Sequence, residues 1–227
     1  MIMLLIKTMK KVGVESPLID IGHADLINEI FADLKIAVKE KKRLRQLLAA
    51  KNRIGIKNHI KSINLKEQAA AVLLKLPSLF GDPKKVVNEL KMMPLSADTK
   101  KALAALEKLF NKLEKFGALK YITFDPMLIS RHGYYTGLIF KGYAQGYSNL
   151  LASGGRYDNL TAKFGLEEAA VGFAVEIENL LDYLNRTEKF SDHLEQRFLI
   201  SYTEAIDFKN AFDLAESLRG LNFIVEV

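Results

Sequence analysis

The sequence contains no cysteine. Disulfide bonds and metal sites with thiolate ligands are therefore excluded. The short histidine spacings HxH and HExxH are also absent, since the four histidines are His23, His59, His132 and His193. The patterns GxSxG and GxxxxGKS/T do not occur either, which argues against a nucleophile elbow and a phosphate-binding loop. We therefore assign no catalytic residue, no metal and no cofactor.

Long apolar stretches are absent too. No run reaches the roughly 18 uncharged residues that a membrane-spanning helix needs, so no membrane contact is expected. The opening "MIMLLIKTMKK" is apolar first and basic second, the reverse of the charge order in a signal peptide. Together with the absence of cysteine, this predicts a cytoplasmic protein. With 227 residues, 49% of them hydrophobic, the chain can build one large core or two small ones.

The formal net charge is +6, and much of the excess lies in "KEKKRLRQLLAAKNR", Lys39 to Arg53. One interpretation is a patch for nucleic acid or an acidic partner. The other is a solvated helix face, because exposed helix faces commonly carry charge. No aromatic residue lies among these charges, so a stacking platform for single-stranded nucleic acid is not expected there.

Hydrophobic spacing predicts a strand at Leu18–Gly22 and then a helix. The apolar face of that helix comprises Leu26, Ile27, Ile30, Phe31 and Leu34. Residues 38–116 are helical in pattern almost throughout. The clearest helix follows Ser96 or Asp98 as its N-cap and ends at Gly117. Its predicted buried stripe comprises Leu103, Leu106, Leu109, Phe110, Leu113 and Phe116.

After Gly117 the apolar spacing changes from helix to strand. "YITFD" reads as a strand, and "YYTGLIFKGYA" and "SNLLASGGRYD" read as a hairpin joined near Gln145-Gly146. A short helix stopped by Gly165, a strand in "AAVGFAVEI" and the helix "ENLLDYLNR" follow. A polar linker then leads to a β-α-β segment with Gly220 at the end of its helix. This order of elements predicts an α+β protein.

The hairpin is rich in tyrosine and glycine. Strict alternation would put Tyr134 and Thr136 on one face and Tyr135 and Gly137 on the other. Gly154-Gly155 would let a ligand or another strand approach the backbone closely, and Arg156 offers a fork for a carboxylate. Two interpretations remain open at this point: a pocket for a small polar ligand, or a sheet whose tyrosines pack on neighbouring strands and whose glycines form a bulge.

Three ordered motifs carry a resemblance to a known family. "YYTGLIF", "ASGGRYDNL" and "AVGFAVEIENLL" resemble the catalytic core of histidyl-tRNA synthetase, where the first two form the histidine pocket and the third is the last class II signature. The resemblance implies a class II synthetase-like antiparallel sheet with a helical insertion and a short β-α-β segment. It divides the chain into a first part of the core (1–37), the insertion (38–117), the β core (118–187), a linker (188–196) and an α/β segment (197–227).

Departures from the synthetase pattern indicate which branch of the family the chain resembles. Asn179 stands where the third signature has an arginine that binds the ATP phosphates. Its side-chain amide has no charge that could stabilise a polyphosphate. Glu176 replaces a glycine beside the nucleotide, so its carboxylate would repel phosphate. The second signature belongs upstream of "MKKVGVESPLID". The chain is therefore expected to be a C-terminal part or an unusual short form, with exposed sheet edge and apolar surface.

A synthetase-like fold without an ATP grip resembles the regulatory subunit of ATP phosphoribosyltransferase. The resemblance implies a non-catalytic subunit that binds histidine as an effector, activates the short-form catalytic subunit in the first step of histidine biosynthesis and confers feedback control. Self-association into a dimer or hetero-oligomer is expected, and tRNA binding is not. Alternatives are a fragment of a divergent histidyl-tRNA synthetase and a general amino-acid sensor.

The resemblance also selects site residues. The histidine contacts that it implies are Ser130, Arg131, Tyr134, Tyr135, Gly154, Gly155 and Tyr157. Arg131 is the expected carboxylate partner, with Ser130 as the alternative that matches the family's register. His132 is expected to pack on the hairpin or face solvent, and Arg156 is expected to pair with Asp158.

Overall fold

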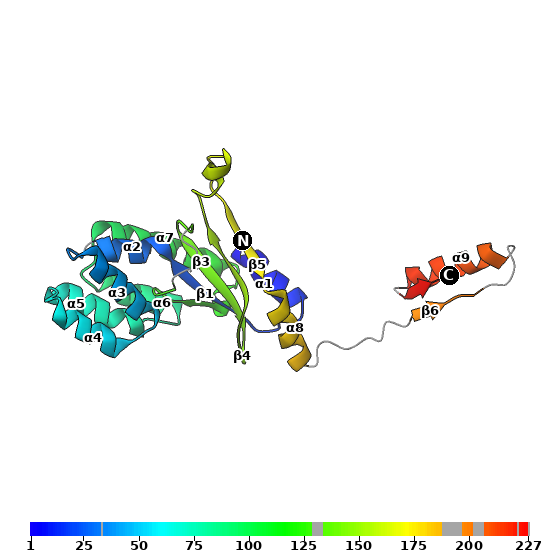
Figure 1. Cartoon of the computed structure of the whole chain (residues 1–227), viewed down its shortest axis with the longest axis horizontal. Helices are drawn as coiled ribbons and strands as arrows, with labels where there is room; N and C mark the ends of the chain where they lie inside the picture. Colours follow the sequence, from blue (N-terminus) through cyan, green and yellow to red (C-terminus); the bar gives the residue numbers. More distant parts are fainter. Residues whose placement is uncertain (33, 129–133, 188–196, 202–206, 222, 227) are drawn as a thin grey trace. The chain divides into compact units, whose positions relative to one another are not determined.

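The computed structural model describes residues 1–32, 34–128, 134–187, 197–201, 207–221 and 223–226. The chain forms two compact units, Met1–Leu180 and Leu181–Val227 (Figure 1). Each unit is described separately below. In the described parts of the chain, no helix is long and apolar enough to cross a membrane.

A five-stranded mixed sheet is the centre of the first unit. Its strands lie in the order β2 (Ile122–Phe124), β1 (Pro17–His23), β3 (Leu138–Ala144), β4 (Tyr147–Arg156) and β5 (Val171–Val175). Strands β1 and β2 are parallel, and every other neighbouring pair is antiparallel. The predicted hairpin is confirmed as β3–β4, with Gly146 at a φ of 80° in its turn, a conformation that glycine adopts without strain. The predicted α+β class is also confirmed.

The pairing register divides the sheet residues between two faces. On one face, which we term the site face, Ile139, Gly155 and Gly172 form one cross-strand row, and Asp20, Lys141 and Ser153 form another. On the opposite face, termed the core face, Phe140 lies beside Gly154. These assignments follow because directly paired residues share a face and successive residues alternate.

Helices cover the core face. Met9 of α1 (Ile2–Lys11) packs so close to Gly142 that a Cβ there would lie 3.0 Å from its sulfur. Phe110 of α7 (Ala97–Lys115) packs against Phe124 of β2, with ring centroids 5.4 Å apart and the rings tilted by 54°. Helix α2 (Ala24–Ala32) buries the predicted apolar face, and Leu34 beyond its end is buried too.

The predicted helical insertion is present. Its helices are α3 (Val38–Ala49), α4 (Arg53–Ser62), α5 (Glu67–Lys75), α6 (Pro83–Lys91) and α7, with a 3-10 turn at Leu76–Ser78. Figure 1 shows α3 to α6 gathered beside the sheet. Ser96 is confirmed as the N-cap of α7, because its hydroxyl accepts a hydrogen bond from the Thr99 N–H at 3.2 Å. Asp82 caps α6 in the same way, through the N–H groups of Lys84 and Lys85.

The predicted stripe of α7 is correct except at its end. Leu103, Leu106, Phe110 and Leu113 are buried, and Leu109 is half-buried. The prediction that Phe116 is buried is wrong, since its side chain is 70% exposed. The helix has already ended there, because Gly117 adopts a φ of 65° and the Ala118 N–H bonds back to the Leu113 carbonyl at 2.9 Å. This C-cap ends the helix, so helical spacing no longer predicts which side chains beyond Lys115 are buried.

The predicted elements after the hairpin are also present. A 3-10 turn at Thr161–Phe164 ends at Gly165, which has a φ of 84°. Strand β5 follows and leads into α8 (Ile177–Arg186). In the second unit, β6 (Arg197–Leu199) and β7 (Ile224–Glu226) pair in parallel and α9 (Asp207–Gly220) connects them in sequence, which confirms the β-α-β pattern. The predicted linker 188–196 lies outside the described residues.

Candidate functional site

Three of the predicted site residues form one aromatic cluster. The rings of Tyr134 and Tyr135 have centroids 4.6 Å apart, and Tyr157 lies 6.0 Å from Tyr134 and 6.4 Å from Tyr135. The alternation predicted for residues 134–137 is wrong, because β3 begins only at Leu138. The segment before it is fixed differently: the Thr136 N–H bonds to the Arg156 carbonyl at 2.9 Å. Both neighbouring tyrosines can therefore turn toward the same cluster.

Two glycines of the site face support these rings. A Cβ added at Gly155 would lie 2.5 Å from the Tyr135 ring, and one added at Gly172 would lie 2.9 Å from the Tyr157 hydroxyl. Gly155 and Gly172 are cross-strand partners, so together they form a flat platform for the two tyrosines. Gly154 faces the other way, where a Cβ would lie 2.7 Å from the Phe140 ring. The structure thus brings Gly155, but not Gly154, to the tyrosine cluster.

The cluster carries polar hydroxyl groups, and that of Tyr135 stays protonated at neutral pH. Burial raises the pKa of the Tyr135 hydroxyl above its usual value, and hydrogen bonding with Tyr134 and the proximity of Tyr157 raise it further. A protonated tyrosine hydroxyl both donates and accepts hydrogen bonds. The cluster can therefore present an aromatic surface and a hydroxyl to a small ring-containing ligand. The remaining predicted contacts, Ser130 and Arg131, and also His132, lie outside the described residues.

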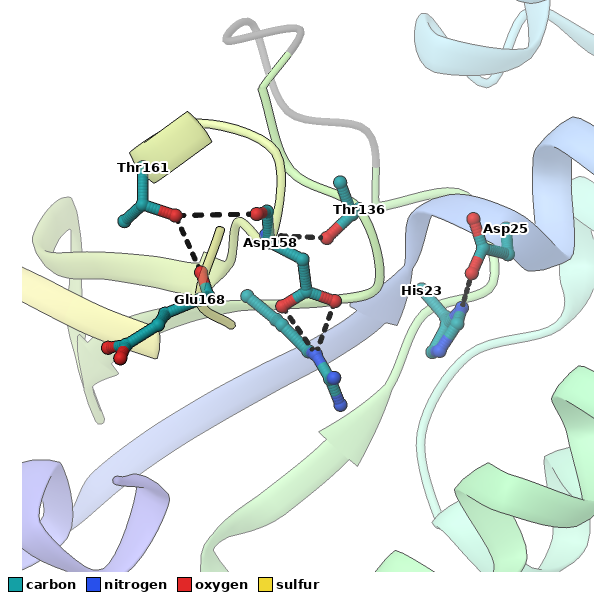
Figure 2. A network of polar contacts seen from close by, with 7 residues as sticks. His23, Asp25, Thr136, Asp158, Thr161 and Glu168 are labelled. Atoms are coloured by element: carbon teal, nitrogen blue, oxygen red, sulfur yellow. Dashed lines mark hydrogen bonds and ion pairs between the residues drawn. The ribbon is translucent and has the colours of Figure 1, made fainter. Parts of the chain in front are cut away.

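A polar network joins the cluster's two segments. Arg156 donates from Nε to both carboxylate oxygens of Asp158 at 2.8 Å, which confirms the predicted pairing. The Asp158 N–H bonds to the Thr136 hydroxyl at 3.0 Å, while the Thr161 hydroxyl bonds to the carbonyls of Asp158 and Glu168. Figure 2 shows Asp158 between Thr136 and Thr161. These bonds fix the backbone on both sides of Tyr157.

A second charged group lies on the site face. The Thr123 hydroxyl donates to the Asp20 carboxylate, and Lys51 forms an ion pair with Asp125 at 2.8 Å. Burial raises the pKa of Asp20, although the bond from Thr123 lowers it and the nearby Asp125 raises it again. Asp125 also accepts the Met127 N–H at 2.8 Å. Sequence reasoning missed this group, since its members are brought together only by β1–β2 pairing and by the insertion.

A cavity of about 700 Å³ lies on the core face, and its lining includes Thr136 and Asp158, the neighbours in sequence of Tyr135 and Tyr157. Apolar residues of α1 and α7 line it together with Phe140, and His23, Asp25 and Arg156 contribute polar groups. His23 Nδ1 is 4.0 Å from the Asp25 carboxylate (Figure 2). Burial lowers the pKa of His23, and the Asp25 carboxylate only partly offsets this. Of the predicted histidine contacts that the structure describes, namely Tyr134, Tyr135, Gly154, Gly155 and Tyr157, none lines this cavity.

Both positions assigned to a lost ATP site form hydrogen bonds with strand β4. The Asn179 amide donates to the Leu150 carbonyl of β4 at 2.8 Å, and the Tyr147 hydroxyl donates to the Asn179 carbonyl at 3.0 Å. Glu176 is exposed, and its N–H bonds to the Leu151 carbonyl at 2.9 Å. Among the described residues no group of three histidine, aspartate or glutamate side chains could hold a metal ion.

The basic segment is exposed, as both interpretations of it require. Between Lys35 and Lys66 the sequence has eleven lysine and arginine residues and a single acid, Glu40. In the described structure only Lys51 of these cations forms an ion pair with a carboxylate. Arg45 instead lies over the Phe31 ring and bonds to Asn28.

A mixed sheet with a helical insertion after β1 and a tyrosine–glycine cluster on one face defines a class II aminoacyl-tRNA synthetase-like fold. The family model described as Histidyl-tRNA synthetase matches residues 1–180, and the chain belongs to this family. An ATP phosphoribosyltransferase regulatory subunit of Clostridium kluyveri is 32% identical over 224 residues, covering 98% of this chain and 57% of the relative. The chain thus spans little more than half the length of that relative.

Solved structures agree with this assignment. A Bacillus halodurans protein described as an ATP phosphoribosyltransferase regulatory subunit/histidyl-tRNA synthetase has a TM-score of 0.80 at 33% identity, covering 99% of this chain and 56% of that one. The ATP phosphoribosyl transferase (HisG:HisZ) complex of Thermotoga maritima has a TM-score of 0.55 at 20% identity, covering 75% of this chain and 58% of that one. The second likeness shows the shared fold alone.

Proposed function

We propose that this chain is the effector-binding part of a regulatory subunit of ATP phosphoribosyltransferase and that L-histidine is its ligand. The cluster of Tyr134, Tyr135 and Tyr157 on the Gly155–Gly172 platform supports this proposal. It offers ring surfaces for the imidazole and hydroxyl groups for its nitrogens. The full-length relatives that carry the regulatory name support the choice among family members.

The observation that carries the proposal is the bond from Asn179 to Leu150. At this place the resemblance to synthetases assigns an arginine that grips ATP. The asparagine has no charge and its amide is already bonded to β4, so it offers nothing to a triphosphate. The exposed carboxylate of Glu176 nearby in sequence adds negative charge. A binding subunit therefore fits this site better than an enzyme that forms an adenylate.

The proposed partner is the short-form catalytic subunit. In the proposed complex, histidine binds one conformation more tightly than another and shifts the population between them, as coupling between two sites requires. Binding of the catalytic subunit would favour the active conformation, and histidine would favour the inhibited one. Self-association of the regulatory subunits is part of the same proposal.

Calorimetry on the full-length protein tests the ligand. We expect saturable binding of L-histidine and a rise in the melting temperature that grows with histidine concentration. Absence of binding by a protein that melts cooperatively would contradict the proposal. A larger shift with another amino acid would instead favour a general amino-acid sensor.

The second candidate is a divergent histidyl-tRNA synthetase, which the family model's description favours. Histidine-dependent exchange of pyrophosphate into ATP separates the two candidates. A regulatory subunit gives no exchange above the rate without protein, whereas a synthetase gives exchange that depends on histidine. Adding the catalytic subunit tests the partner: histidine should inhibit phosphoribosyl transfer only when both subunits are present.

A further inference from the structure

Strand β5 forms one edge of the five-stranded sheet. In the described part of the chain it pairs with β4 alone, over an unbroken register from Val171 to Val175. Its sequence, VGFAV, contains no charge and no proline, and the Val171 side chain is 44% exposed. Soluble proteins usually protect a sheet edge with a charge, a proline or a bulge. This edge has none of these three features, so it is suited to pairing with a further strand.

The opposite edge of the sheet is protected. Strand β2 has three residues, and Gly81 covers its outer side. The Gly81 N–H bonds to the Phe124 carbonyl at 3.2 Å, and the Phe124 N–H bonds to the Gly81 carbonyl at 2.8 Å. Between the two edges that the structure describes, β5 is therefore the one that can accept another strand.

The hydrogen bonds to β4 show which backbone groups of β5 point outward. At one end the Tyr157 N–H bonds to the Ala170 carbonyl at 2.8 Å. At the other end the Glu176 N–H bonds to the Leu151 carbonyl at 2.9 Å. Because bonded positions alternate along an antiparallel ladder, every second residue between these ends directs its N–H and C=O away from β4. The outward residues are Val171, Phe173 and Val175.

The side chains of β5 have nearly the same order of size in both directions. An antiparallel second copy with Phe173 on the two-fold axis places Val171 opposite Val175 of the other copy. It also places Gly172 opposite Ala174 of the other copy. Large apolar side chains then meet on the core face and small ones on the site face. A two-fold contact needs such a self-complementary surface, which favours a second copy of this chain over an unrelated strand.

We propose that two copies of this chain associate by antiparallel pairing of their β5 strands, with Phe173 on the two-fold axis and one sheet continuing through both copies. Pairing bonds the outward backbone groups of each strand to the other and removes the exposed Val171 side chain from water. The inference specifies the self-association named in the proposed function. Its test needs no ligand, so the two proposals can fail separately.

Sedimentation velocity of the 227-residue chain over a wide range of concentration tests the association. We expect a reversible equilibrium between monomer and dimer. Val171→Lys should weaken the dimer about 10-fold, because each dimer contains the pair of residues 171 and 175 twice. Val38→Lys is the matched control, since it makes the same substitution at a valine of α3 that is 83% exposed. It should leave the equilibrium unchanged. A chain that stays monomeric, or equal effects of the two substitutions, would overturn the inference.

Cross-linking tests the register of the pairing. Because the chain has no cysteine, Ala174→Cys introduces a single thiol at an exposed position of β5. In the proposed dimer the two copies of residue 174 share the site face and lie about 8 Å apart, two residues along the strands and one strand spacing across. A short bis-maleimide should therefore link them.

Ala49→Cys, at an exposed position of α3, is the control and should give little covalent dimer. Equal yields at the two positions would contradict the pairing. If Val171→Lys does not melt cooperatively, Ala174→Lys replaces it in the sedimentation experiment. A dimer that forms as described while histidine fails to bind would overturn the proposed ligand and leave this inference standing.

Discussion

The side chain of Asn179 ties the start of helix α8 to strand β4, because its amide donates to the Leu150 carbonyl at 2.8 Å. The Tyr147 hydroxyl adds a second bond to the Asn179 carbonyl at 3.0 Å. In this chain the position therefore serves the packing of helix on sheet. A nucleotide would have to break these bonds before Asn179 could contact it.

Asn179→Ala should lower the free energy of unfolding by about 1–2 kcal/mol, because the half-buried Leu150 carbonyl loses its partner. It should not change the response to ATP, since no ATP contact is lost. Urea denaturation measures the first effect, and thermal shift with ATP measures the second. Asn185→Ala, an exposed substitution on the same helix, should cost less than about 0.5 kcal/mol. Equal costs at the two positions would show that the bond to Leu150 does not stabilise the fold.

Local pattern in the sequence predicts most of the helices. The N-cap Ser96, the terminator Gly117 and the buried stripe of α7 all follow from spacing and backbone preference. The exposure of Phe116 does not follow from spacing, because burial at a helix end depends on where the chain turns next. The sheet order β2-β1-β3-β4-β5 also lies beyond such reasoning, since pairs such as Asp20 with Lys141 join distant parts of the sequence.

Gly155→Ala should destabilise the fold and weaken histidine binding. Its Cβ would lie 2.5 Å from the Tyr135 ring and 2.6 Å from the Leu138 carbonyl oxygen, so ring and strand would have to separate. Forced repacking of this kind costs about 1–3 kcal/mol. Chemical denaturation measures the stability, and calorimetry with L-histidine measures the affinity at a temperature where the variant is folded.

Gly137→Ala is the matched control for this change. It lies close in sequence to Tyr135, and the nearest atom to its added Cβ is 3.7 Å away, at ordinary contact distance. Its effect on stability should stay within about 0.5 kcal/mol. Similar losses in both variants would mean that close packing at Gly155 is not what holds the tyrosine in place.

The candidate site was only partly predictable, for a physical reason. The motif residues gather as expected at Tyr134, Tyr135 and Tyr157, but their arrangement depends on the glycine platform. The sequence around Gly172 does not reveal that this glycine belongs to the site, because its role arises from pairing with Gly155.

His23 should make the fold less stable in mild acid. Burial lowers its pKa in the folded state below the ordinary value of 6.5; the Arg156 charge also lowers it, and Asp25 raises it. As the pH falls through about 6.5, the unfolded chain binds this proton more readily than the folded one, so stability decreases until the pH is below the folded pKa. Urea midpoints measured between pH 7.5 and about 5 should show this decrease.

Two variants separate the contribution of His23 to the pH dependence of stability from that of other titrating groups. His23→Gln should flatten the decrease relative to the unaltered protein. Asp25→Asn should steepen it, because the carboxylate 4.0 Å from Nδ1 no longer supports the charged imidazole. Identical pH profiles for His23→Gln and the unaltered protein would mean that this histidine does not titrate differently in the two states.

The ion pair between Lys51 and Asp125 joins the helical insertion to the sheet, and its two members differ in exposure. The Asp125 side chain is 10% exposed and that of Lys51 is 45% exposed. Lys51→Met should therefore cost about 1–2 kcal/mol, because a largely buried carboxylate loses its closest cation. Solvent screening of the half-exposed lysine keeps this cost below that of a fully buried pair.

Lys84→Met is the control, since Lys84 pairs with Glu114 at 2.6 Å and both side chains are about half exposed. It should cost less than about 0.5 kcal/mol. Urea denaturation in low and high salt distinguishes the two, and equal costs would show that Asp125 is not stabilised by Lys51.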